Sequence, residues 1–163
     1  MAARKEPSRW VLLSYRMPRE PSTPRISVWR QLERIGVARL GDGLVGLPAD
    51  PRTREQLDWI ATEIRQADGT ATVWLGTPAS PDEEEAIVDG LRTARAAEYD
   101  AITGKATVAA TAAADERARA LRRLREELRK VARRDFFPPP QRERAQAAVE
   151  ALLVDSATRT STR

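Results

Sequence analysis

The sequence contains no cysteine and no histidine among its 163 residues. Without them there can be no disulfide, thiolate nucleophile, Cys/His zinc site or imidazole base. Ser14 has no histidine to activate it, and no two carboxylates are evidently placed for acid/base or metal chemistry. We therefore predict a protein that is not an enzyme, with no catalytic residue, no metal site and no cofactor.

Long hydrophobic runs are also absent, since no apolar stretch approaches the roughly 20 residues of a membrane span. The N-terminal sequence MAARKEPSR is basic but leads into only a short apolar segment, which does not fit a signal peptide. These features predict a cytoplasmic protein without a membrane partner.

Lysine is scarce. Of the 28 basic residues only Lys5, Lys105 and Lys130 are lysine, and the rest are arginine. Arginine presents a planar donor fork that suits phosphate and other oxyanions, although the codon preference of a GC-rich genome explains the same bias. The formal net charge is only +4, so binding of a polyanion would need a local basic patch.

Residues 1–79 follow a βαββαβ pattern. Strands are predicted at 10–15, 37–40, 43–47 and 70–75, where short runs are apolar or β-branched. Helices are predicted at about 24–35 and 52–67, with Val28, Trp29, Leu32 and Ile35 on one face of the first. This order is typical of the ferredoxin-like α+β fold, a four-stranded antiparallel sheet with two helices on one face. Trp10, Trp29, Trp59 and Trp74 are predicted to lie in the core.

Residues 80–155 have a different composition, rich in Ala, Glu and Arg. They predict a helical hairpin plus a third helix, with Leu121, Leu124, Leu128 and Val131 forming a packing seam. The bland stretch 105–114 fits either a helix or a linker. Residues 1–8 and the tail 156–163 are polar, and we expect both to be disordered.

The first candidate site is an arginine cluster in the loop and helix that follow the first strand, made of Arg16, Arg19, Arg25, Arg30 and Arg34. Arg30 and Arg34 are spaced i, i+4, where like charges repel slightly unless an anion neutralises them. Arg16 and Arg19 are expected close to the helix N-terminus, which favours anions. The cluster is either a surface that contacts phosphate or another oxyanion, or an ordinary solvated helix face.

The second candidate site is the segment 117–134, which carries nine basic residues. Such a basic amphipathic helix can lie along a nucleic-acid backbone or an acidic partner. It is equally an ordinary helix with one buried seam and one wet face.

Several motifs resemble the N-terminal region of the bacterial ChrB family of chromate-resistance regulators. They are Tyr15-Arg-Met-Pro-Arg-Glu-Pro-Ser-x-Pro-Arg25, Val28-Trp29-Arg30-x-Leu32 with Ile35-Gly36, Pro51-Arg-Thr-Arg-Glu-Gln56, and Ala71-Thr-Val-Trp74. The resemblance spans about residues 10–152. It implies a transcription regulator that binds promoter DNA of a chromate-efflux operon and responds to chromate. Family members carry a C-terminal sensing domain without a counterpart here, so we expect a stand-alone homologue or the product of a split gene.

The βαββαβ order also resembles the middle domain of PaaX-type repressors and the CRISPR spacer-acquisition nucleases. Those nucleases need an aspartate just after the tyrosine of the first strand. Arg16 occupies that position here, which argues against metal-dependent cleavage.

Three functions remain open. The leading hypothesis is a regulatory module that binds DNA through the five arginines, with a second copy as a further partner. The second is a helical interaction module in which the seam of residues 121–131 pairs with another chain. The third is an oxyanion sensor, in which two of Arg16, Arg19 and Arg25 hold chromate as an effector.

Overall fold

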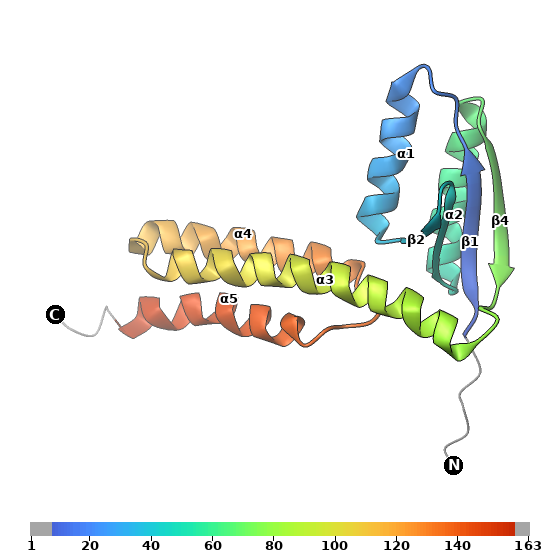
Figure 1. The fold of residues 1–163 in the computed structure, drawn as a ribbon. Helices are drawn as coiled ribbons and strands as arrows, with labels where there is room; N and C mark the ends of the chain where they lie inside the picture. The colour runs from blue at the N-terminus through green and yellow to red at the C-terminus, as the bar shows by residue number, and fades with distance from the viewer. Residues whose placement is uncertain (1–7, 159–163) are drawn as a thin grey trace, which may run out of the picture. The chain divides into compact units, whose positions relative to one another are not determined.

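The computed structural model describes residues 8–158, apart from the side chains of 154–158. The elements follow one another as β1 (Trp10–Arg16), α1 (Ser22–Ile35), β2 (Ala38–Gly41), β3 (Leu44–Pro48), α2 (Pro51–Gln66), β4 (Thr70–Gly76), α3 (Pro81–Ala110), α4 (Ala114–Arg133) and α5 (Gln141–Thr158) (Figure 1). Of the two tails expected to be disordered, residues 1–7 and 159–163 lie outside the described part. Residues 156–158 of the expected C-terminal tail belong to α5.

The four strands form one antiparallel sheet in the order β2-β3-β1-β4. Together with the two helices this confirms the ferredoxin-like α+β fold. Val11 and Leu13 of β1 are fully buried. Their side chains lie on the face of the sheet that α1 and α2 cover. Leu12 and Ser14, on the opposite face, are only half-buried, because none of the described helices covers them.

α2 begins at a reciprocal hydrogen-bonded cap. Asp50 Oδ1 accepts from the backbone N–H of Thr53 at 2.8 Å, and Thr53 Oγ1 accepts from the backbone N–H of Asp50 at 3.0 Å. Two otherwise unpaired donors of the helix start are thereby satisfied. Pro51, the first residue of the helix, has no backbone N–H, so this position leaves no donor unpaired.

The prediction that all four tryptophans are core residues is wrong for three of them. Trp10 is 2% exposed, and its indole N–H donates to Glu84 Oε1 at 2.9 Å. Trp29, Trp59 and Trp74 are 53%, 68% and 53% exposed. Smaller side chains such as Val28 and Leu57 already fill the interface between helices and sheet, and Trp74 projects from the uncovered face.

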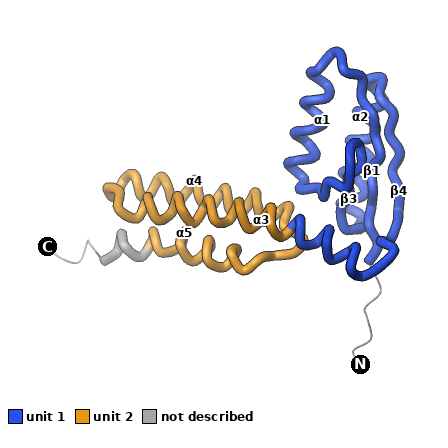
Figure 2. The backbone as a smooth tube through the Cα atoms, in the orientation of Figure 1, with its two compact units in different colours: residues 1–91 blue, residues 92–163 orange. Residues whose placement is uncertain are grey.

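The chain divides into two compact units, residues 1–91 and 92–163, and the division falls inside α3 (Figure 2). The sequence-based boundary, between residues 79 and 80, precedes this helix. Residues 105–110, for which the sequence left helix or linker open, complete α3, and the chain turns at 111–113.

The second unit has its own core between α3, α4 and α5. It contains Leu121, Leu124 and Val131, with Leu128 partly buried against them. The leucine seam is thus buried within this chain. This corrects the hypothesis that the seam pairs with another chain. No helix in the described part of the chain is both long and apolar enough to cross a membrane.

Candidate nucleic-acid and oxyanion interface

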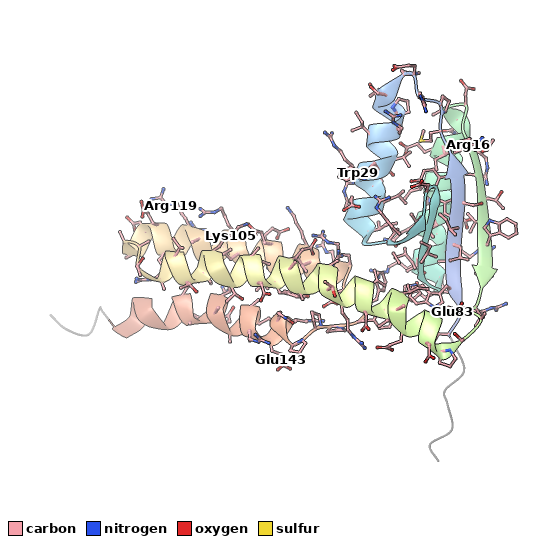
Figure 3. The ribbon with its side chains drawn as sticks, viewed as in Figure 1. Arg16, Trp29, Glu83, Lys105, Arg119 and Glu143 are labelled. Carbon is pink, nitrogen blue, oxygen red and sulfur yellow. The ribbon has the colours of Figure 1, made fainter. Side chains whose placement is uncertain are left out.

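The five arginines of the first candidate site are all exposed and occupy three elements. Arg16 ends β1, Arg19 lies in the loop before α1, and Arg25, Arg30 and Arg34 project from α1. Figure 3 shows Arg16 where β1 ends and Trp29 on α1. Among the described side chains, none provides an ion pair or hydrogen bond to any of the five.

Other arginines of the same unit are satisfied within the protein. Arg39 Nη2 lies 2.7 Å from Glu33 Oε1, and Arg65 donates to the backbone carbonyl of Ala71 at 2.9 and 3.2 Å. The cluster therefore concentrates positive charge that the described residues do not compensate. Such a surface attracts anions from solution.

Two members of the cluster lie beside an exposed aromatic ring. Arg16 and Arg25 line a shallow hollow of about 410 Å³. The complete lining is Tyr15, Arg16, Met17, Arg25, Ile26, Trp29 and Gly43, with no acidic residue. Guanidinium groups next to an indole offer both phosphate contacts and an apolar or stacking surface.

A second hollow, of about 570 Å³, contains the other two helical arginines. It is lined by Thr23, Ile26, Ser27, Arg30, Gln31 and Arg34. Ile26, 45% exposed, lines both hollows. The two hollows are therefore neighbours on the surface of α1. Arg19 lines neither of them.

Glu63 of α2 holds the polar residues of the second hollow. Ser27 Oγ donates to Glu63 Oε1 at 3.1 Å, and Gln31 Nε2 donates to Glu63 Oε2 at 2.5 Å. These bonds tie α1 to α2, so the arginines project from a fixed helix. The two donors also compensate this half-buried carboxylate for part of its lost hydration.

A glycine fixes the edge of the first hollow. Gly43 has a φ of 71°, and a Cβ atom placed on it would lie 2.3 Å from the carbonyl oxygen of Tyr15. The same turn comes close enough for the Tyr15 N–H to donate to the Gly43 carbonyl at 2.8 Å. The tight turn between β2 and β3 therefore forms one edge of the first hollow, next to Arg16 at the end of β1.

The sequence missed Trp29 as a site residue. Its spacing relative to Val28 and Leu32 suggested the buried face, but only those two residues are buried. The usable signal was the i, i+4 spacing of Arg25 and Trp29, which puts both side chains on the same side of a helix.

The basic segment 117–134 is mostly engaged within the second unit. Arg125 binds both carboxylate oxygens of Glu150 at 2.9 and 3.0 Å. Arg129 pairs with Glu126, Arg134 pairs with Glu98, and Arg117 is only 2% exposed. The ordinary structural interpretation thus accounts for much of this charge.

A further hollow, of about 830 Å³, lies between α3 and α4. Its lining combines alanines with Val108, and its Lys105 already pairs with Glu127 at 2.7 Å. It offers less uncompensated charge than the arginine cluster. Within the described residues no group of three metal-binding side chains comes together.

Comparisons with known proteins agree with the resemblance seen in the motifs. The profile of the family described as "Protein ChrB, N-terminal" matches residues 25–160. Protein ChrB of Cupriavidus metallidurans is 32% identical over 160 residues, covering 88% of this chain and 47% of its own length. The chain thus spans about half the length of this relative. No solved structure matches the chain.

Proposed function

Because this chain belongs to the ChrB N-terminal family, we propose that it is a non-enzymatic chromate-resistance regulator that binds promoter DNA through Arg16, Arg19, Arg25, Arg30 and Arg34. One observation carries the proposal. All five guanidinium groups lack partners among the described side chains, and those of Arg16, Arg25, Arg30 and Arg34 line two adjoining hollows beside α1.

The expected binding is dominated by the DNA backbone. Arginine forks fit phosphate oxygens, and Arg30 and Arg34 both line the second hollow. Each phosphate that is neutralised releases a counterion, so affinity must fall steeply with salt. The exposed Trp29 adds a contact that does not depend on charge.

The test is fluorescence anisotropy with a duplex from the protein's own upstream region, measured across a salt series. In the Arg30→Ala/Arg34→Ala double variant we expect the slope of log affinity against log salt to become shallower by about 2, one for each lost phosphate contact. Arg9→Ala is the matched control, because Arg9 is an exposed arginine just before the opposite end of β1. No binding at low salt, or an unchanged slope in the double variant, would refute the proposal.

The first hollow favours a second candidate function, an oxyanion sensor. Arg16 and Arg25 line the same hollow, and its lining has no acidic residue. A tetrahedral dianion such as chromate can therefore accept hydrogen bonds from both guanidinium groups. Chromate should then raise the melting temperature, and sulfate, of the same charge and shape, should do so less. An unchanged melting temperature, or the same increase in Arg16→Gln, contradicts this candidate.

A further inference from the structure

The β4 edge of the sheet carries an open row of backbone hydrogen-bonding groups. The backbone N–H of Tyr15 donates to Gly43, on the β3 side of β1. Tyr15 stands opposite Ala71 in the pairing of β1 with β4, Leu13 opposite Val73, and Val11 opposite Leu75. Because backbone direction alternates along a strand, these are the pairs without mutual hydrogen bonds. The N–H and C=O groups of Ala71, Val73 and Leu75 therefore point away from the sheet.

Part of this edge is already used. Arg65 donates through Nε and Nη2 to the carbonyl oxygen of Ala71. No comparable hydrogen bond is found at Val73 or Leu75 among the described residues. The free stretch is therefore the second half of β4, centred on Trp74.

Edge strands are usually protected from pairing by charge, proline, short length or a bulge. The other edge strand, β2, has four residues, includes the charged Arg39 and shifts register between Arg39 and Gly41. β4 has seven residues, TATVWLG, without charge or proline. Trp74 and Leu75 there are 53% and 44% exposed. Only β4 lacks these protections.

We propose that β4 is a dimerisation edge, at which the strand of a second copy pairs antiparallel around a two-fold axis at Trp74. In this register Val73 of one copy faces Leu75 of the other, and each such pair exchanges two backbone hydrogen bonds. Ala71 stays outside the pairing, so Arg65 keeps its contact. Trp74 of one copy stands opposite Trp74 of the other on the uncovered side of the sheet, where each indole N–H donates to Ser14 Oγ of its own β1 at 2.8 Å.

A second copy fits this edge better than an unrelated strand because the edge is complementary to itself. Two uncharged strands pair without repulsion, and a two-fold axis places Trp74 opposite Trp74 and each Leu75 opposite a Val73. Strand pairing alone buries less than the roughly 1,200 Å² of a stable standard interface. The dimer should therefore dissociate on dilution.

Sedimentation equilibrium of the full chain tests the assembly. The weight-average mass should rise with concentration from 18.2 kDa toward twice that value. Leu75→Pro removes one outward N–H but no bond to β1, and Trp74→Lys opposes two like charges across the axis. Both variants should weaken the dimer at least about tenfold, while Trp59→Lys on α2 should not. A monomer at every concentration, or a dimer indifferent to Trp74→Lys in a variant that is folded by circular dichroism, overturns the proposal.

Cross-linking tests the register. The natural sequence has no cysteine, so any disulfide must involve the introduced residue. Under a mild oxidant, Trp74→Cys should form a disulfide-linked dimer quickly, because facing residues of a non-hydrogen-bonded pair come close enough for a disulfide. Thr72→Cys is the matched control on the same strand and face, since Thr72 would face Gly76. Equal cross-linking rates for the two variants refute the axis at Trp74.

Discussion

The guanidinium carbon of Arg39 lies 6.0 Å from the centre of the Trp29 ring, while Nη2 of the same arginine binds Glu33 Oε1 at 2.7 Å. A cation at that distance over an aromatic face is attracted by the ring. Arg39 therefore holds the indole at the margin of the first hollow and is itself held by Glu33. An exposed aromatic positioned in this way can take part in binding at little entropic cost.

Replacing Trp29 by alanine should weaken DNA binding by about tenfold, or about 1.4 kcal/mol, because the apolar contact of the exposed indole with the DNA is lost. The salt slope should not change, because the indole releases no counterion. Anisotropy titrations at several salt concentrations measure both quantities. Trp59→Ala is the control for loss of an exposed indole, and an equal effect of both variants would exclude a local role of Trp29.

Gly43→Ala should lower the free energy of unfolding by at least about 1–2 kcal/mol, the cost of a side chain in the left-handed region. The new Cβ would also approach the Tyr15 carbonyl too closely. Gly41→Ala in the same turn is a close control, because nothing lies within 4 Å of its added Cβ. Urea unfolding measures the difference, and equal losses would show that the close approach at Gly43 does not matter.

Tyr99→Phe should destabilise the second unit. The hydroxyl of Tyr99 donates to Asp135 Oδ2 at 2.8 Å, and the Asp135 side chain is completely buried. Loss of the donor should cost about 1–3 kcal/mol, because a buried acceptor loses a partner. Chemical denaturation at neutral pH measures this, and a difference below about 0.5 kcal/mol would show that the bond is replaced by another.

The same residue predicts a pH dependence. Burial, and then the hydrogen bond to Asp135, raise the pKa of Tyr99 above the ordinary value of 10.0. Above pH 10 the unfolded chain loses this proton while the folded protein keeps it, so stability is full below pH 10 and falls as the pH rises further. The decline should be shallower in Tyr99→Phe. Identical alkaline slopes in both proteins would contradict the assigned shift.

Glu63→Ala should cost about 1–2 kcal/mol, because Ser27 and Gln31 both lose their acceptor between α1 and α2. Glu55→Ala is the control, since Glu55 is exposed on α2. Thermal unfolding compares the two variants. A melting temperature in Glu63→Ala equal to that of Glu55→Ala would mean that these bonds do not hold α1 in place.

The fold was predictable because local signals agreed with one another. Asp50-Pro51 opens α2, Gly36 ends α1 in the left-handed conformation, and the hydrophobic pattern changes period between strands and helices. The arginines of the cluster were predictable as exposed because charge is costly to bury. Their common surface was visible for Arg30 and Arg34, which share a helix face.

Other features depend on contacts between distant segments, which residue type alone does not determine. Indole is apolar enough for a core, so composition could not tell Trp10, buried beside Glu84, from Trp74 on the uncovered face. Likewise, the pairing of Arg125 with Glu150 joins two helices and is not visible in the sequence of either one. The basic segment 117–134 therefore looked more available than it is.

The continuous helix α3 determines how the chain can be cut. Proteases need an extended, accessible backbone, and residues 91 and 92, where the compact units divide, lie within a helix of 30 residues. Limited proteolysis should therefore spare that point and act first at the turn 111–113 or in the segment 134–140. A truncated chain meant to retain the first unit would end inside α3 and would expose carbonyl groups that the next helical turn now satisfies.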